Sequence, residues 1–507
     1  MAPRPPPCTP PLRTLLCALS LAWAFMGASE AIAKPARVRA ASAGMPAPVA
    51  GAIYASGLPL KSFGFYAQEV GGDERTLVAL NGDTPYTMAS TTKVVTALAA
   101  LDLLGPYYRW RTSAYALGPI VRGRLLGDLL IVGGGNAQLT SAELQAWFTR
   151  MREQGLEEIQ GDIVLDRFAF DLSDEDHANT PAQSARQPRH VWPAALTLDE
   201  GRLGVTVSAA RGGRRAAALS LAPELSEVAL VNQVVPGALC QVNARWDDDG
   251  ADGPGGAARI VVRGSWRAAC GTRTIEFIPP PHSGYAARAL PAMWAKAGGI
   301  LRGRVVASDK PLGDKALPIG TDGEVLQPLS FQRSKPLPEL VRDINKTSDN
   351  MAARNLMLSL SPGFPERAAT LAGAQKIMRM WLREQGIADG DIEVENGSGL
   401  SHTERAKPRA LVQLLRQGWR TEQSEAFLDS LPIAGVDGTL TNRLVGGHAQ
   451  GRAFLKTGTL NDTRALAGYV RAASGRLYAV SAMVNHAAAA AGRPALDAFI
   501  EWVARNG

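Results

Sequence analysis

Three short strings of the chain contain side chains that could carry out nucleophilic chemistry together. They are Ser90-Thr91-Thr92-Lys93, Ser348-Asp349-Asn350 and Lys456-Thr457-Gly458. In the first string a serine stands three residues before a lysine at the expected start of a helix, so both side chains lie on one helical face. A serine hydroxyl needs a base, and a lysine can serve if desolvation or a nearby cation lowers its pKa toward neutrality. Ser90 is therefore a candidate nucleophile and Lys93 its base, although Ser90 alone could be merely a helix cap.

The second string supplies groups that acyl transfer needs. The hydroxyl of Ser348 can pass a proton to a leaving amine, and the amide of Asn350 can hold both a substrate carbonyl and Lys93. Taken alone, this string would be interpreted as a helix cap, because it precedes the apolar run 351–360.

The third string lies on a predicted strand. There Lys456 would attract a carboxylate, or act as the second cation beside Lys93. Thr457 and Thr459 alternate with Gly458, and a glycine lets another backbone, such as that of a peptide, approach closely. Backbone N–H groups at the helix start and at Thr459 could bind the oxyanion of a tetrahedral intermediate. Taken alone, this string would be a solvated edge strand.

The order of the three strings is more specific than any one of them. S-x-x-K, then S-x-N, then K-T-G is the signature of penicillin-binding proteins and serine β-lactamases, which the chain resembles. Ser90 and Ser348 lie 258 positions apart, much farther than in the compact relatives. This gap resembles the penicillin-binding protein 4 type, a low-molecular-mass class C family of D-alanyl-D-alanine carboxypeptidases and endopeptidases with large domains inserted after the nucleophile helix.

Other strings extend the resemblance over most of the chain. They are Gly127-Asp128-Leu129 followed by Val132-Gly133-Gly134-Gly135, then Asn396 to Ser401, and Asp437-Gly438-Thr439. Two departures concern Asn136-Ala137, where relatives often have Asp-Pro, and Arg354, where an acidic residue is common. Both put local packing and substrate preference in doubt and leave the three main strings intact.

The resemblance implies a role for each site residue. Ser90 would be acylated, Lys93 would be its base, Ser348 would relay a proton, Asn350 would hold substrate, and Lys456, Thr457, Gly458 and Thr459 would bind the substrate carboxylate. It also implies peptidoglycan stem peptides as substrates, β-lactams as covalent inhibitors and no cofactor. Two alternatives remain open, namely a serine β-lactamase and a slow-turnover protein that binds the cell wall or senses β-lactams.

Composition bears on metals and partners. The six histidines are dispersed without metal-ligand spacing, and no metal is expected. The formal charge of +7 could suggest nucleic acid, but the arginines are scattered and no basic run contains interleaved aromatics. A basic surface would suit an anionic wall polymer or membrane face, or be simply solvated. The amphipathic segment 494–503 could lie on a membrane as a peripheral contact, or pack on its own sheet. Oligomeric state is not predicted.

The elements that would position these residues can be read from hydrophobic periodicity. Residues 62–70 and 76–79 read as two strands, a helix begins near Ser90, and 454–460, 465–470 and 477–484 read as three more strands. Helical patterns occur at 285–296, 349–360, 367–384 and 493–505. We therefore expect an α+β fold, in which one antiparallel sheet with packed helices unites the two ends of the chain.

The remaining segments suggest export and an insertion. Residues 1–33 read as a cleavable signal peptide and predict a periplasmic protein. Residues 34–110 and 282–507 would form the catalytic domain, and 111–281 one or two inserted, mostly β domains that end at the linker Pro279-Pro280-Pro281. Cys240 and Cys270 would be the only cysteines of the mature chain, and they either form a disulfide or remain buried thiols.

Overall fold

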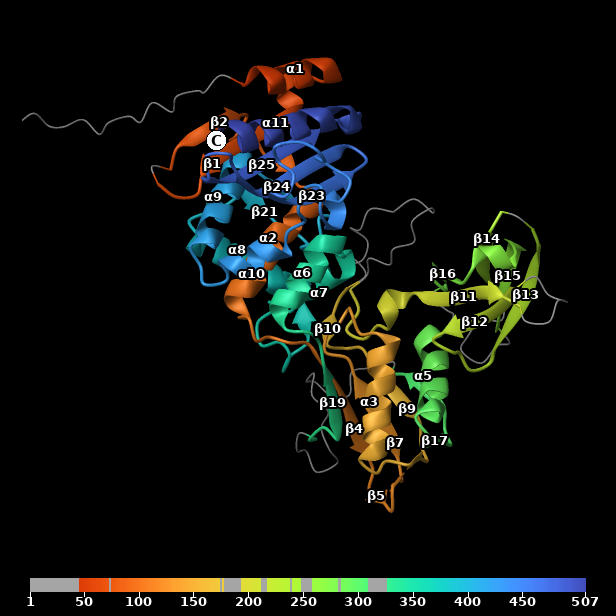
Figure 1. Cartoon of the computed structure of the whole chain (residues 1–507). Coiled ribbons are helices and arrows are strands. Elements are labelled where there is room, and N and C mark those ends of the chain that lie inside the picture. The colour runs from red at the N-terminus through yellow and green to blue at the C-terminus, as the bar shows by residue number, and fades with distance from the viewer. Residues whose placement is uncertain are drawn as a thin grey trace, which may run out of the picture. The chain divides into compact units, whose positions relative to one another are not determined.

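The computed structural model in Figure 1 describes most of the chain. The described residues are 45–72, 74–173, 176, 193–210, 217–237, 239–247, 258–280, 284–308 and 326–507. The expected signal peptide at 1–33 lies outside them. None of the helices in this part of the chain is both long and apolar enough to cross a membrane.

A five-stranded antiparallel sheet joins the two ends of the described chain, as the sequence predicted. Its strand order is β2-β1-β25-β24-β23. These strands are β1 (Phe63–Glu69), β2 (Thr76–Leu80), β23 (Ala453–Leu460), β24 (Thr463–Arg471) and β25 (Leu477–Asn485). Strand β1 pairs with β25 from Phe63 opposite Val484 to Glu69 opposite Tyr478. The early hairpin is therefore completed by strands from the far end of the sequence.

Helices cover both faces of this sheet. Because side chains alternate along a strand, Leu466 packs with α1 (Ala47–Ser56) and α11 (Arg493–Asn506), whereas Ala465 and Ala467 face the larger helical layer. That layer consists of α2 (Thr92–Leu103), α6 (Leu337–Thr347), α7 (Asn350–Leu358), α8 (Leu371–Glu384), α9 (Pro408–Trp419) and α10 (Ser424–Ser430). The apolar side of α11 is buried, with Phe499 stacked on Phe65 at 5.0 Å between ring centroids. The sequence left open whether this segment lies on a membrane or packs on its own sheet, and in the structure it packs on the sheet.

Short strands complete this part of the fold. A small sheet has the order β21-β22-β3 and consists of β3 (Tyr86–Thr87), β21 (Ile392–Glu393) and β22 (Arg405–Ala406). A parallel pair joins β10 (Phe170–Asp171) to β20 (Ala369–Thr370).

The inserted region contains a second five-stranded sheet with the order β18-β9-β7-β4-β19. Its strands are β4 (Arg111–Leu117), β7 (Asp128–Val132), β9 (Ile163–Asp166), β18 (Val305–Ala307) and β19 (Ser330–Arg333). Helices α3 (Ser141–Glu153) and α5 (Tyr285–Lys296) share one core with it. A small sheet nearby in sequence contains β5 (Ile120–Val121), β6 (Arg124–Leu125), β8 (Glu158–Ile159) and β17 (Ile300–Leu301).

This strand pairing moves the exit from the inserted region. The exit predicted from the sequence is residue 281, but β18 pairs with β9 and β19 pairs with β4. Trp294 of α5 also packs edge-on against Phe148 of α3, at 5.7 Å between ring centroids. Strands β18 and β19 therefore belong with the inserted sheet and not with the catalytic one.

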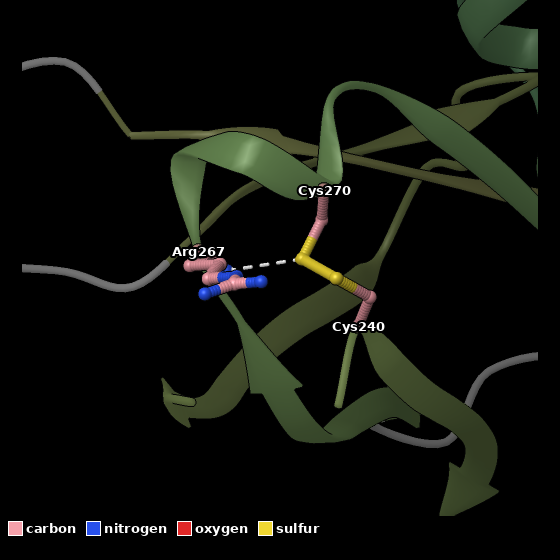
Figure 2. Close-up of a disulfide and its surroundings, with 3 residues drawn as sticks. All are labelled: Cys240, Arg267 and Cys270. Atoms are coloured by element: carbon pink, nitrogen blue, oxygen red, sulfur yellow. Dashed lines mark hydrogen bonds between the residues drawn. A yellow bond between two sulfur atoms is a disulfide. The ribbon is translucent and has the colours of Figure 1, made fainter. Parts of the chain in front are cut away.

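A separate β unit lies within the insertion. It contains two three-stranded sheets, ordered β12-β11-β16 and β13-β15-β14. The strands are β11 (Leu203–Ala209), β12 (Ala217–Ala222), β13 (Val228–Pro236), β14 (Gln241–Asp247), β15 (Ala258–Trp266) and β16 (Arg273–Phe277). Figure 2 shows the disulfide that joins Cys240 to Cys270, with the backbone N–H of Arg267 donating to the Cys270 sulfur at 3.4 Å. This bridge closes a loop of the β unit.

Candidate active site

The first string forms a short 3-10 turn that runs directly into a helix. Ser90 lies in the turn Ala89–Thr91, and α2 begins at Thr92. Ala89 has a φ of +47°, an uncommon conformation for a residue with a Cβ. A Cβ added to Gly399 would lie 2.0 Å from the Ala89 carbonyl oxygen and 2.5 Å from the Ser90 nitrogen. Gly399, the second glycine of the 396–401 string, is thus required for close approach to the backbone of the serine.

Lys93 connects the first string to the second. Its side chain is buried, and Nζ donates to Ser90 Oγ at 3.2 Å and to Asn350 Oδ1 at 2.6 Å. It also donates to the backbone carbonyl of Ser398 at 2.5 Å. Two acceptors from distant parts of the sequence, Asn350 and Ser398, therefore hold this amino group beside the serine.

The three residues of the second string lie at the junction of α6 and α7, and each makes a different contact. Ser348 ends α6 with a φ of +60°, and Asp349 caps α7 by accepting a hydrogen bond from Ala352 N at 3.0 Å. Asn350 is consequently the first residue of α7 and reaches Lys93. The helix cap expected from the sequence exists, but Asp349 provides it, which leaves the hydroxyl of Ser348 available for other contacts.

The third string lies on β23, at the edge of the catalytic sheet. Lys456 is buried, and its Nζ donates to Ser348 Oγ at 2.9 Å and to Thr457 O at 3.0 Å. Burial, and then the positive charge of Lys93, lower the pKa of Lys456 well below its usual range. The structure therefore brings all three strings together around two buried lysines.

Gly458 and the two threonines occupy different surroundings. A Cβ on Gly458 would lie 2.6 Å from the carbonyl oxygen of Met88 and 3.2 Å from Cβ of Ala89. The sequence predicts a substrate backbone close to this glycine, whereas in the structure the segment before Ser90 lies there. Thr457 is half-buried and Thr459 is exposed. These two side chains remain accessible from the outer edge of the strand.

A buried glutamate that the sequence analysis did not single out supports the loop behind Lys93. Glu404 has no exposed surface, and its carboxylate accepts from the backbone N–H groups of Asn396 at 2.9 Å, Gly397 at 2.7 Å and Gly399 at 2.6 Å. Burial raises the pKa of Glu404, and these hydrogen bonds oppose the shift. Nothing in the sequence marks one glutamate among many as the organiser of this loop.

The two departures noted in the sequence lie around α7. Arg354 is buried, and burial lowers its pKa while the charges of Glu404 and Glu395 oppose that shift. One turn of α7 also contacts the glycine string of the inserted region, because Asn355 Nδ2 donates to Gly135 O at 2.8 Å.

Among the described residues, no group of three or more His, Cys, Asp or Glu side chains is placed to hold a metal ion.

Comparison with known proteins yields relatives of one kind. The protein resembles the D-alanyl-D-alanine carboxypeptidase DacB of Haemophilus influenzae, with 26% identity over 432 residues, 83% of this chain and 85% of the relative. A D-alanyl-D-alanine carboxypeptidase of Actinomadura sp. is 28% identical over 424 residues, 79% of this chain and 74% of the relative.

Structural comparison agrees with the sequence match. The crystal structure of penicillin-binding protein 4 from Haemophilus influenzae matches with a TM-score of 0.66 and 25% identity, over 87% of this chain and 94% of that one. The resemblance to the penicillin-binding protein 4 type and the expected fold class are both confirmed. A family model described as the D-Ala-D-Ala carboxypeptidase 3 (S13) family matches residues 48–506. The chain therefore belongs to the D-Ala-D-Ala carboxypeptidase 3 (S13) family.

Proposed function

We propose that this protein is a serine D-alanyl-D-alanine carboxypeptidase that acts on peptidoglycan stem peptides through an acyl-enzyme on Ser90. One observation carries the residue assignment. Lys93 Nζ lies within hydrogen-bond distance of both Ser90 Oγ and Asn350 Oδ1, while Lys456 Nζ contacts Ser348 Oγ. A nucleophile, a base and a proton relay are thus adjacent, as covalent acyl transfer requires.

In the acylation step, neutral Lys93 takes the proton of the Ser90 hydroxyl, and Oγ attacks the carbonyl carbon of the penultimate D-alanine. The backbone N–H groups of Ser90 and Thr459 would stabilise the resulting oxyanion. The C–N bond then breaks, the proton that Lys93 took from Ser90 passes by way of Ser348 to the amine of the terminal D-alanine, and D-alanine leaves while Lys93 is neutral again. Asn350 would hold the substrate as well as Lys93.

In the second step, water attacks the ester carbonyl while neutral Lys93 takes a proton from it. Lys93 then gives this proton to Ser90 Oγ. The C–O bond to Ser90 breaks, and the shortened peptide leaves as a free acid. A lysine can act as a base only when it is neutral, and two buried ammonium groups near each other disfavour a full double charge. The lowered pKa of Lys456 is consistent with such a shared charge.

Substrate would be recognised at the outer edge of β23. The hydroxyls of Thr457 and Thr459 would donate to the carboxylate of the terminal D-alanine, and the charge of Lys456 would attract it. Gly458 would contribute by allowing close packing of the Ser90 segment against the strand. A D-alanyl cross-link presents the same acyl group to the site, so endopeptidase activity could accompany carboxypeptidase activity.

The direct test is mass spectrometry of the intact protein and its peptides after treatment with penicillin. We expect one adduct, on Ser90, and none on the Ser90→Ala protein. That variant should also lose the release of D-alanine from a pentapeptide by at least about 1,000-fold. An adduct on a different residue, or D-alanine release that survives in Ser90→Ala, would contradict the proposal.

The same preparations separate the alternative activities. Cross-linked muropeptide dimers measure endopeptidase activity, and rapid hydrolysis of penicillin with no lasting adduct would identify a β-lactamase. A protein that acylates but releases no D-alanine would be a β-lactam sensor.

We further propose a periplasmic location, since the substrate lies outside the cytoplasmic membrane and residues 1–33 have a signal-peptide pattern. Cell fractionation of the full chain tests this location.

A further inference from the structure

One loop reaches the candidate site without belonging to any of the three strings. The 3-10 turn Gly438–Leu440 contains Thr439, an exposed residue. Thr457 Oγ1 donates a hydrogen bond to Thr439 Oγ1 at 2.8 Å. Two hydroxyls from separate segments are therefore adjacent at the edge of β23.

A shielded ion pair holds this loop. Lys346 Nζ, on the last turn of α6, donates to both carboxylate oxygens of Asp437, at 2.9 and 2.7 Å, and to Leu431 O at 2.6 Å. Asp437 also accepts from Ile433 N at 2.8 Å. The Lys346 side chain is only 14% exposed, so solvent screens this pair less than a surface pair.

The loop also packs tightly against the end of α6. Gly438 has a φ of +57°, and a Cβ there would lie 3.0 Å from the carbonyl oxygen of Lys346 and 3.1 Å from Cβ of Pro432. Lys346 stands two residues before Ser348 in the sequence. One side chain thus joins the segment that carries Ser348 to the loop that carries Thr439.

We propose that Thr439 is a further hydroxyl of the carboxylate-binding site, beside those of Thr457 and Thr459, and that Lys346 and Asp437 are positioning residues that hold it next to Thr457. This rests on the proposed function, which places the carboxylate of the terminal D-alanine at β23. A carboxylate has two oxygens, each of which accepts hydrogen bonds, so neighbouring hydroxyls can donate to it at once. Thr439 would therefore determine specificity for substrates that carry this carboxylate.

The test compares two substrates on matched variants. One is an acyl-D-alanyl thioester whose leaving group carries a carboxylate, and the other is its methyl ester; thioesters are reactive enough for the neutral substrate to be measured. Thr439→Val removes the hydroxyl while keeping the shape. We expect it to lower kcat/KM for the carboxylate substrate by about 10-fold, with less than a twofold change for the methyl ester.

Two further variants serve as controls for the hydroxyl. Thr439→Ser keeps a hydroxyl and should restore most of the preference for the carboxylate. Thr421→Val changes a threonine at the end of α9, where its hydroxyl donates to Gly418 O, and should leave the preference unchanged. An equal loss on both substrates in Thr439→Val, or no loss on either, would overturn the assignment.

The positioning role is tested with Lys346→Met and Lys346→Arg. We expect Lys346→Met to reduce the preference for the carboxylate substrate at least fivefold, and Lys346→Arg, which can still bind both oxygens of Asp437, to recover part of it. A loss of this preference in Lys346→Met that Lys346→Arg does not restore in part would contradict the positioning role of Lys346. If the wild-type protein neither forms a penicillin adduct nor releases D-alanine, the proposed function fails; if it does both while all variants keep its preference, only the role of Thr439 fails.

Discussion

The lysines at 93 and 456 are unusual because neither has any exposed surface. Removing an ammonium group from water is costly unless other groups replace its hydration. Lys93 has three acceptors, whereas the contacts of Lys456 include one hydroxyl and one carbonyl. The lowered pKa of Lys456 expresses this cost. Lys456 therefore lowers the free energy of unfolding of the protein, at a position where the proposed chemistry needs a positive charge.

Substituting Lys456 should separate stability from activity. We expect Lys456→Met to lower the rate of penicillin acylation by about 100-fold or more, while raising the free energy of unfolding near neutral pH by about 1–3 kcal/mol, because a buried charge is replaced by an apolar chain of similar length. Acylation kinetics and thermal unfolding measure the two effects. A protein less stable than wild type would contradict this account.

The stabilisation should depend on pH in a defined direction. Lys456 loses its proton at a lower pH when folded than its usual value of 10.5. Between these two values the unfolded chain binds more protons, so the free energy of unfolding of the wild type rises with pH over that window. The advantage of Lys456→Met should therefore shrink as the pH approaches 10.5.

The sequence predicted those site residues that belong to short, ordered strings, because spacing along one helix or strand determines which side chains share a face. It singled out neither Glu404 nor Lys346, and it marked Thr439 only as part of a family-like string, without a role. Each is a common residue type whose position depends on contacts between segments distant in sequence. Gly458 illustrates the same limit, since a strand pattern does not reveal which backbone will approach a glycine.

At the scale of elements, the loop 395–404 connects the helical layer to the serine. It presents the carbonyl of Ser398 to Lys93, and Gly399 packs against the backbone of Ser90. The carboxylate of Glu404 satisfies successive backbone N–H groups of this loop. The position of Lys93, the proposed base, therefore depends on Glu404. This glutamate acts through the backbone of the loop, to which its carboxylate is hydrogen-bonded.

Glu404→Gln should disturb this loop. A glutamine side chain has the same shape, but its NH2 group would face a backbone N–H that now donates to a carboxylate oxygen. We expect a loss of stability of about 1–3 kcal/mol and a decrease in acylation of about 10-fold or more. The exposed Glu393→Gln is the matched control and should behave as wild type. Unchanged acylation in Glu404→Gln would refute the positioning role.

Most elements of the catalytic part were predictable, because their apolar residues form runs of strand length or recur at helical spacing, even where both faces are buried, as in β24 and β25. The strand expected at 465–470 is β24 (Thr463–Arg471), and the helix expected at 367–384 is α8 (Leu371–Glu384). The partners of α5 were not predictable. Its apolar face indicates that it packs on a sheet but not on which one, and this explains the early boundary at 281.

At the scale of the whole chain, the β unit and the helical layer around the serine have separate hydrophobic cores. The core of the β unit contains Cys270, whereas the core around α2 contains Met88 and Val94, which stand before and after the serine in sequence. The disulfide links cysteines 30 positions apart, so it constrains only that unit. Stability of the β unit and activity of the site should therefore respond independently.

Removing the disulfide tests this independence. The double variant Cys240→Ser, Cys270→Ser should destabilise the β unit by about 3–4 kcal/mol, as loop-closure entropy for this separation indicates. Limited proteolysis within 203–277 should accelerate, while kcat/KM for D-alanine release should change less than twofold. A parallel loss of activity would show instead that the site depends on this unit.

The order of strands in the catalytic sheet bears on when the site can exist. Ser90 and the β1–β2 hairpin emerge early during synthesis, but β23 supplies Lys456 and β25 is the strand that pairs with β1. Chains are made from the amino end, at about 5–20 residues per second. During the intervening interval the nascent chain holds a serine without its neighbouring strand, and a hairpin with an open edge. The site therefore lacks Lys456 until β23 has been made, and the sheet stays open beside β1 until β25 follows.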